Sequence, residues 1–511
     1  MSANAKEMLR VVDESNLPSI IDGLLAASRS PRGRKRELSV RALLLGMFLV
    51  TDTGRLHLGR IPAALNNLPP QVKAELGLTR ENGVTMRQVQ RLYTLVSTVL
   101  DKQGHDYAQD RFNDLLGPTI PPECFDTKSI AIDGTDIHAF ARSFNMKDPI
   151  TGHVTKMSTD KDAHWRARSE DKRWKAPFFG YDLTVAVAVK EVTGPDVPVV
   201  ARAIRFRPAT QDPVMNGLAV AHDVWVQQGN QLGDVLVDRE YTKTADGRDF
   251  ILPIRSLGGE PVFDLTPALV GSRAPINGAL MIDGNPFSPA TPTKWHNITP
   301  PPVNATNTVK LAYQAEVNKR AMFALVPHGR RDANGAHNFQ CPAQVGNIKC
   351  PLVPASKAWP VGTRLAQGPA TKAPSGKVCS QKFVKFDATD MPLSQRDLFG
   401  TSAWYQSYTR RNLVEGFFGS LKNNGVEGVR PGNVRMRGLV KHGLFIAVAT
   451  AAANLRHVES FRARNPQAPK RVRRGRPLKT NLHRYKEQIN MSGIRQEAFV
   501  KAVMAASSPP S

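Results

Sequence analysis

Residues 183–206 read LTVAVAVKEVTGPDVPVVARAIRF, and this stretch decides the fold class. Two runs rich in Val, Ala and Ile, residues 183–192 and 197–206, lie on either side of a Gly-Pro-Asp turn. Strand-forming residues that flank a turn predict a β-hairpin. The middle of the chain is therefore expected to form a sheet.

The segments on both sides of this hairpin predict a larger sheet. Upstream, SIAIDGTDIHAF (129–140) is rich in strand formers, and downstream GDVLVDREY (233–241) holds a short buried strand that ends at Asp238. Between them a helix is expected, because Asp212 suits an N-cap and Pro213 the first helical position. The order strand, hairpin, helix, strand predicts an α/β fold with a mixed sheet covered by helices.

The flanking composition divides the rest of the chain. We expect a helical domain over residues 1–124, an α/β core over 125–243 and 401–460, a β-rich insertion over 244–400 and a basic tail over 461–511. The insertion is rich in Pro and Gly, and it shows no helical period of any length. Helices are expected again at Ser407–Asn423 and at Val434–Leu455, the second of them buried.

One amphipathic helix of the first domain is a candidate for DNA contact. Thr85 is a plausible N-cap, and Val89, Leu92 and Val96 then fall on one face. Arg87 and Arg91 lie one turn apart, away from that stripe. The segment fits the recognition helix of a helix-turn-helix unit, and it also fits a helical bundle with solvated arginines.

The charge balance indicates a polyanionic partner. The chain has 69 Lys and Arg against 44 Asp and Glu, a net charge of +25. Such an excess attracts nucleic acid. Residues 461–486 hold ten Lys or Arg and no acid. Within them Arg474-Gly475-Arg476-Pro477 resembles the core of an AT-hook, which lies in the A·T minor groove, while a generic basic tail on phosphates is the alternative.

Other classes of protein are excluded by simple features. Four cysteines among 511 residues rule out a disulfide scaffold and suit a reducing compartment. The N-terminus lacks the apolar core of a signal peptide. The longest apolar run, Leu444–Leu455, is too short to span a bilayer. We therefore expect a cytoplasmic protein that handles DNA or RNA, with no membrane partner.

Residues 408–422, YTRRNLVEGFFGSLK, combine an acid, two bases and a phenol on one predicted helix. At 100° per residue Tyr408, Arg411, Glu415 and Lys422 project within an arc of about 60° if the helix begins by Tyr408. The neighbouring face is apolar and suits packing on a core. A solvated face with helical salt bridges is the plainer interpretation of the same pattern.

The spacing of these four residues resembles the Y-R-E-K signature of the DDE transposases of bacterial insertion sequences. Two further blocks are similar to those of the same family and follow in the same order. Ile132-Asp133-Gly134-Thr135 resembles the block with the first catalytic Asp, and Val237-Asp238-Arg239-Glu240-Tyr241 the block with the second. Phe179-Gly180-Tyr181 resembles a block that opens the intervening hairpin. The resemblance covers roughly residues 125–460.

The resemblance implies an RNase H-like catalytic fold, often with a β-rich insertion before the catalytic Glu. Asp133, Asp238 and Glu415 are then the catalytic carboxylates that bind Mg²⁺ or Mn²⁺, and hard cations of this kind prefer oxygen ligands. Arg411 and Lys422 are expected to neutralise DNA phosphates, and Tyr408 to stack on or hydrogen-bond to the DNA end. The implied activity is cleavage at the ends of a mobile element and joining of the 3′-hydroxyl ends to target DNA.

The partners implied are terminal inverted repeats, target DNA and at least a second copy of the chain, because two ends must be paired. A bacterial location near the nucleoid follows. Two alternatives remain open: a structure-specific nuclease on the same fold, and a non-catalytic DNA-binding regulator derived from a transposase. A strand-transfer assay with a pre-cut end separates the first alternative from a transposase.

Several neighbouring residues compete for these roles. Asp136 lies three positions after Asp133, so an extended strand turns it to the opposite face. Glu240 shares the face of Asp238 or is a surface acid. Cys341, Cys350 and Cys379, with His328 or His337, offer a zinc site or ordinary thiols, although the segment has no Cys-x2-Cys pair. Trp295 and Trp404 suit a wedge for a flipped base or, more simply, core packing.

Overall fold

The structure is a computed structural model that describes residues 3–28, 36–51, 54, 56–78, 81–166, 177–243, 247–302, 304–332, 335–365, 376–423, 426–430 and 433–464. These residues form two compact units. Unit 1 contains the described residues up to Lys190, Gly194–Gln228 and the described residues from Asn412 onward. Unit 2 contains Glu191–Thr193 and Gly229–Arg411. Arg474 and Arg476 of the basic tail lie outside the described residues.

The first part of unit 1 is helical, as its sequence predicts. Its α-helices are α1 (Ala3–Glu14), α2 (Leu17–Ala27), α3 (Val40–Thr51), α4 (Ile61–Asn66), α5 (Pro70–Glu75), α6 (Met86–Lys102) and α7 (His105–Leu116). The N-cap of α6 is confirmed: Thr85 and Gln88 form a reciprocal capping box. Val89, Leu92 and Val96 are buried, and Arg87 and Arg91 are exposed.

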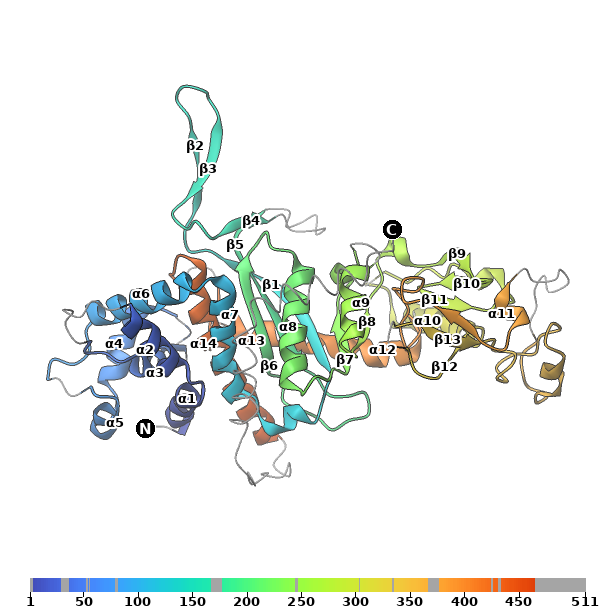
Figure 1. Ribbon diagram of the computed structural model, residues 1–511, viewed down its shortest axis with the longest axis horizontal. Coiled ribbons are helices and arrows are strands. Elements are labelled where there is room, and N and C mark those ends of the chain that lie inside the picture. The colour runs from blue at the N-terminus through green and yellow to red at the C-terminus, as the bar shows by residue number, and fades with distance from the viewer. Residues whose placement is uncertain are drawn as a thin grey trace. The chain divides into compact units, whose positions relative to one another are not determined.

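The predicted hairpin is part of the sheet in unit 1 (Figure 1). The strands are β1 (Ile130–His138), β4 (His164–Arg166), β5 (Phe178–Ala188) and β6 (Ala201–Pro208). β5 pairs antiparallel with β1, β4 and β6, in a register that sets Leu183 opposite Phe206. A separate hairpin consists of β2 (Ser143–Lys147) and β3 (Val154–Ser158). Helix α8 (Pro213–Gln227) packs on β1, β5 and β6, and its expected cap is confirmed, because Asp212 accepts a hydrogen bond from the Val214 amide.

The edge of β6 that faces away from β5 is closed by amide side chains. Asn454 accepts from the Ala201 amide at 2.7 Å and donates to the Ala201 carbonyl at 2.9 Å. Asn113 of α7 bonds both backbone groups of Ile204, and Gln109 accepts from the Phe206 amide at 2.7 Å. The exposed backbone of an edge strand would otherwise pair with another strand. These side chains therefore fix α7 and the helix that carries Asn454 to the sheet.

That helix is α14 (Leu439–Arg464), which begins and ends later than the segment Val434–Leu455 predicted from the sequence. It is buried almost continuously from His442 to Asn454, as its apolar surface predicts. It packs against α3, α6, α7 and β6, so it joins the helical part of unit 1 to the sheet. Helix α13 (Asn412–Leu421) packs on β1 and β5. Among the described residues, no helix has both the length and the apolar character to cross a membrane.

Unit 2 begins with the predicted strand β7 (Asp234–Val237), which pairs parallel with β8 (Glu260–Phe263). Two small antiparallel sheets follow. Their strands are β9 (Ser272–Ile276), β10 (Ala279–Ile282) and β11 (Asn285–Phe287) in one, and β12 (Val326–His328), β13 (His337–Gln340) and β14 (Val384–Phe386) in the other. Parallel and antiparallel strands with covering helices confirm the α/β class of the chain.

Residues 244–400, whose sequence shows no helical period, contain helices as well as strands. They contain α9 (Arg248–Ser256), the 15-residue α10 (Asn307–Ala321) and the short α11 (Lys377–Ser380), and α12 (Ser402–Tyr408) follows them. Only Tyr313, Val317 and Arg320 of α10 are buried, and one of these is charged. Val309 and Leu311 are exposed. The helix therefore has no apolar stripe, and a search for the helical period misses it.

We expect Asn454→Ala to lower the free energy of unfolding by about 2–6 kcal/mol. The change leaves the buried amide and carbonyl of Ala201 without partners, at about 1–3 kcal/mol for each group. Urea unfolding followed by circular dichroism measures the loss. Thr450→Ala is the matched control on the same helix, because Thr450 is buried and bonds only the carbonyl of Ile446. Equal losses in both variants would contradict the role of the β6 edge.

Candidate active site

Asp133 lies in the middle of β1, the strand that runs along β5 for its whole length. The register is regular from Ile130 opposite Ala188 to His138 opposite Gly180, so the strand has no bulge that would turn a side chain. Asp133 is half-buried, and its Oδ1 accepts a hydrogen bond from the Gly134 amide at 2.8 Å. Asp136 is three residues further on and lies on the opposite face of the strand. Asp133 thus shares its face with Thr135.

The end of α13 lies on this same face of β1. Lys422, the residue after α13, donates to Thr135 Oγ1 at 2.6 Å and to the carbonyl of Asp136 at 3.1 Å. The contact joins residues 287 positions apart in the sequence. Glu415 is in the first turn of α13 and is exposed, while Val414, Phe417 and Phe418 of the helix are buried. Unit 1 therefore places Glu415 on a helix that packs on the strand of Asp133, and Lys422 directly after that helix, where it contacts the same strand.

A pocket of about 280 Å³ adjoins Lys422 in unit 1. It is lined by residues of β1, of the segment after α13 and of α14: Thr135, Asp136, Ile137, His138, Lys422, Val429, Arg430, Val434 and His442. His442 is fully buried and contacts the rings of Tyr181 and Phe206, and this burial lowers the pKa of His442 to about 3. The imidazole is therefore neutral at physiological pH, and the cationic groups of the pocket are Lys422 and Arg430. Two cations beside one acid, Asp136, leave the pocket with an excess of positive charge that suits a phosphate or another anion.

In unit 2, Asp238 follows directly after β7 and is half-buried. Its Oδ1 accepts from the Glu240 amide at 2.8 Å, so the carboxylate caps the 3₁₀ turn Arg239–Thr242. Arg411 Nη2 lies 3.8 Å from Asp238 Oδ2. The competing residue Glu240 lies in the capped turn. Asp238 and Arg411, two residues that the sequence assigns to the site, are thus ion-paired within one unit.

Asp264 is a candidate that the sequence analysis missed. It follows β8 as Asp238 follows β7, and the parallel register sets Val237 opposite Phe263. The two aspartates therefore lie at matching carboxyl ends of neighbouring parallel strands. Burial raises the pKa of Asp264, the charge of Asp238 also raises it, and Arg239 and Arg411 lower it. The signal in the sequence is the shared pattern of DVLVD (234–238) and EPVFD (260–264), an acid and three apolar residues before an Asp.

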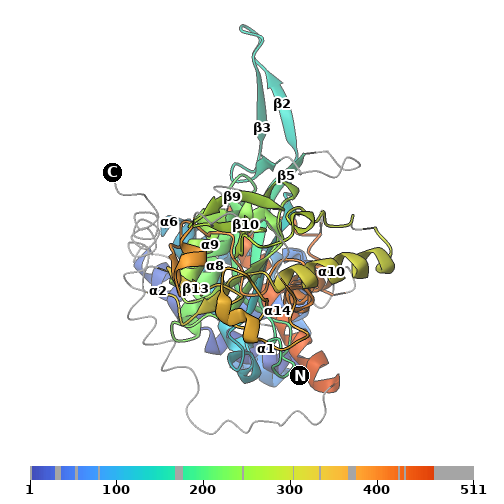
Figure 2. The same ribbon diagram turned by 90° about the vertical axis from the view of Figure 1, so that its right-hand side faces the viewer.

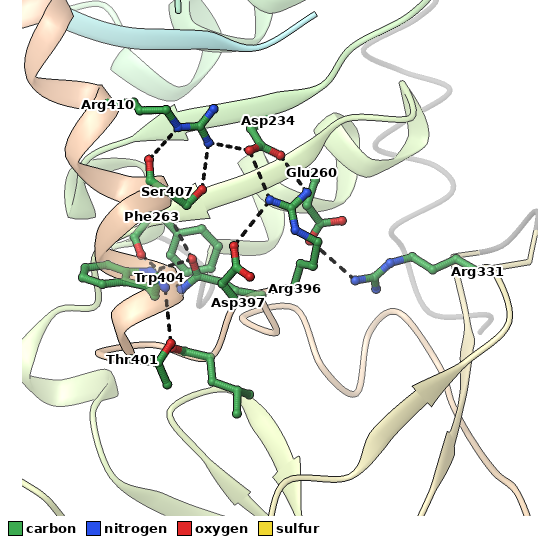
Figure 3. A network of polar contacts seen from close by, with 12 residues as sticks. Asp234, Glu260, Phe263, Arg331, Arg396, Asp397, Thr401, Trp404, Ser407 and Arg410 are labelled. Atoms are coloured by element: carbon green, nitrogen blue, oxygen red, sulfur yellow. Dashed lines mark hydrogen bonds and ion pairs between the residues drawn. The ribbon is translucent and has the colours of Figure 1, made fainter. Parts of the chain in front are cut away.

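Buried arginine contacts hold the end of α12 against β7 (Figure 3). Arg410 is 7% exposed and pairs with Asp234, the first residue of β7, while also bonding the hydroxyl and carbonyl of Ser407. Arg396 forms a bidentate pair with the same carboxylate, at 2.9 and 3.1 Å. The next residue, Arg411, pairs with Asp238 at the other end of β7. Two consecutive arginines therefore contact both ends of one strand.

The expectation of one helix from Tyr408 to Lys422 is wrong. Helix α12 ends at Tyr408, a 3₁₀ turn covers Thr409–Arg411, and α13 begins at Asn412. The four signature residues therefore do not share a 60° arc. The 3₁₀ turn contains Arg410 and Arg411, which form ion pairs with Asp234 and Asp238 at the two ends of β7. These tertiary contacts account for the interruption of the α-helix at this point. Tyr408 stacks on Trp404, with ring centres 4.6 Å apart and planes within 13°.

Trp295, Trp404, Cys341 and Cys350 of unit 2 are core residues. Trp295 and Trp404 are 2% and 3% exposed and donate to Glu316 and Gln395, which confirms core packing. Cys341 and Cys350 belong to one buried cluster, and Cys379 packs against another. Burial raises the pKa of Cys379 to about 11 and also raises that of Cys341.

In the part of the chain that the structure describes, no three His, Cys, Asp or Glu side chains are grouped as metal ligands. Asp133 and Glu415 of unit 1 and Asp238 of unit 2 are each carboxylates that are not fully buried, and carboxylate oxygens are the ligands that hard divalent cations prefer. No protein-family model matches this chain, and no curated protein sequence is significantly similar to it.

We expect Asp234→Ala to destabilise unit 2 by about 3–5 kcal/mol, because it leaves the buried Arg410 guanidinium without its counter-ion. The free energy of unfolding in urea of the full chain measures the effect. Asp397→Ala is the control, since Asp397 lies 3.4 Å from the half-exposed Arg396 and such a pair contributes about 0–1 kcal/mol. A loss no larger than that of the control would show that Asp234 does not anchor α12.

Proposed function

We propose that this chain is a DDE transposase with an RNase H-like catalytic core. The observation that carries the proposal is the contact between two blocks of the resemblance. Lys422, the last residue of the Y-R-E-K signature, bonds Thr135, which is two positions after Asp133 in the first catalytic block. Residues that are separated by most of the chain, and that the resemblance assigns to one site, are in direct contact within unit 1.

In this proposal Asp133, Asp238 and Glu415 hold Mg²⁺ or Mn²⁺. When bound, such ions activate the attacking hydroxyl and stabilise the leaving oxygen of a phosphodiester. Lys422 and Arg430 bind phosphates of the DNA at the pocket beside β1, and Arg411 binds a phosphate next to Asp238. Tyr408 offers a ring on which a terminal base stacks.

The whole-chain charge of +25 supports DNA as the substrate. Exposed Arg87 and Arg91 of α6 add phosphate contacts, and Arg474 and Arg476 of the tail add others. Synapsis of two element ends requires two copies of the chain in the reaction. A bacterial cytoplasm, where the nucleoid is accessible, is the proposed location.

We expect Glu415→Ala to abolish Mg²⁺-dependent nicking of a duplex that carries the DNA flanking the gene. Nicking and joining should both fall by more than about 100-fold, because the three carboxylates act as one unit. Affinity for the duplex should stay equal or rise slightly, since a negative charge is removed. Asp133→Ala and Asp238→Ala should behave alike, and double variants should be no worse than single ones. Gel-based cleavage, strand transfer from a pre-cut end and a gel shift measure the three quantities.

Glu459→Ala is the matched control for this experiment. Glu459 is also an exposed glutamate on a helix of unit 1, so its removal changes the net charge equally. It should nick and join as the wild type does. Nicking by Glu415→Ala at the control rate would remove Glu415 from the active site, and the transposase proposal with it. Nicking without joining by the wild type would instead indicate a nuclease.

We expect removal of residues 465–511 to weaken DNA binding and flatten its salt dependence. The slope of log affinity against log salt should fall by about 0.9 for each phosphate that the tail neutralises in the full-length chain. Fluorescence anisotropy with a labelled duplex at several salt concentrations measures the slope. Arg476→Ala should weaken binding more on A·T-rich than on G·C-rich DNA if the AT-hook interpretation is right. An unchanged slope would show that the tail does not touch DNA.

A further inference from the structure

The hairpin β2–β3 projects from unit 1 as an arm (Figures 1 and 2). Its two strands pair with each other, from Ser143 opposite Ser158 to Lys147 opposite Val154. Among the described strands, they form a two-stranded sheet of their own. A hairpin of two strands is at best marginally stable in water unless one of its faces is covered. We therefore expect a partner to cover one face of the arm.

One face of the arm is apolar. Side chains alternate along a strand, so Phe144 and Met146 share a face, and the register adds Met157 opposite Phe144. These three side chains are 54%, 51% and 39% exposed. Large apolar side chains that cluster on an exposed surface mark a binding site more often than an isolated one does.

The tip of the arm is a defined turn. Asp148 Oδ1 accepts from the amides of Ile150 and Thr151, both at 2.8 Å, and the Asp148 amide donates to the carbonyl of His153 at 2.8 Å. Gly152 takes the left-handed conformation that the turn requires, with φ of 68°. The result is a constrained loop that presents Ile150, which is 93% exposed, next to Pro149.

The root of the arm is anchored to the core of unit 1. Asp160 is buried and accepts from the hydroxyl of Tyr181 at 2.8 Å and from the amide of Gly438 at 3.1 Å. Asp162 accepts from the amide of Leu439, the first residue of α14, at 2.7 Å. The strand that leads into the arm is β1, which carries Asp133. The root of the arm is therefore anchored to the core of unit 1, and the arm follows the strand that carries Asp133.

The charge of the arm favours a polyanion as its partner. Residues 142–158 contain three basic residues, Arg142, Lys147 and Lys156, and one acid, Asp148. Arg142 and Lys147 are exposed. A second copy of the chain, which is itself strongly basic, is less complementary to this arm than DNA is. Apolar side chains such as Ile, Met and Phe enter the minor groove and separate base steps in DNA-bending proteins.

We propose that the β2–β3 arm binds in the minor groove of the DNA on which the chain acts, with Ile150 as a wedge between base pairs and Arg142 and Lys147 on the backbone phosphates. The inference rests on the proposed function, because it takes DNA as the substrate. It adds a bend in the DNA close to the strand that carries Asp133. Such a wedge kinks a duplex by about 20–90°.

Energy transfer between dyes at the two ends of a 40-base-pair duplex tests the bend, with the full-length chain and without Mg²⁺. The wild type should bring the ends closer. Ile150→Ala should lose this change and keep the wild-type salt dependence of binding, because it removes no charge. The double variant Arg142→Ala/Lys147→Ala should lower the slope of log affinity against log salt by about 1.8, or 0.9 per phosphate.

Two controls make the result specific to the arm. Val361→Ala truncates a side chain that is also β-branched and is 99% exposed, but lies in unit 2, and it should bend DNA as the wild type does. Glu415→Ala should also bend DNA normally, because it changes catalysis and not the arm. Thermal unfolding should be the same for all of these variants, since the substituted residues are exposed.

The possible failures are distinguishable. Wild-type bending and salt slope in both arm variants would overturn the arm proposal and leave the transposase proposal intact. If those variants also sediment as smaller species without DNA, the arm binds a second copy instead. Loss of bending in Ile150→Ala, together with no Mg²⁺-dependent nicking by the wild type, would uphold the arm and overturn the proposed function. A wild type that binds no duplex would overturn both.

Discussion

The free edge of β6 is the constraint on which much of unit 1 depends. A strand edge presents amides and carbonyls that must find partners once water is excluded. Asn113 and Gln109 of α7 and Asn454 of α14 supply these partners. An amide side chain suits the task because it donates and accepts at once, as a neighbouring strand would. These hydrogen bonds therefore connect helices α7 and α14 directly to the sheet.

The position of α14 then determines the surroundings of β1. The helix holds the root of the β2–β3 arm through Asp160 and Asp162, and it contributes His442 to the pocket beside Lys422. Helix α13 reaches the Asp133 face of β1 from the same part of the chain. One buried helix thus connects the closed sheet edge, the proposed phosphate pocket and the arm. A disturbance at Asn454 is expected to reach all three.

In unit 2, ion pairs and not amide side chains connect a strand to its neighbouring segment. The strand, β7, has only four residues, and its two ends are contacted by Arg410 and Arg411. The pair with Asp234 is buried, so its attraction is strong but depends on each partner being present. The pair with Asp238 is more exposed and involves a residue that is also assigned to catalysis. Arg411 therefore contacts the end of β7 and also compensates the negative charge of Asp238. Asp264 adds a second carboxylate at the matching end of β8.

The sequence by itself determined the features that depend on near neighbours. The hairpin of β5 and β6, the caps at Thr85 and Asp212 and the buried length of α14 all follow from local pattern, because backbone propensity and side-chain period act over a few residues. The break at Thr409–Arg411 does not, since Arg410 pairs with a residue 176 positions away. Helix α10 could not be predicted from the helical period, because only three of its side chains are buried and they form no apolar stripe. The contact of Lys422 with Thr135, the role of Asp264 and the closure of β6 were decided only by the tertiary structure, because each depends on which distant segments share a strand edge.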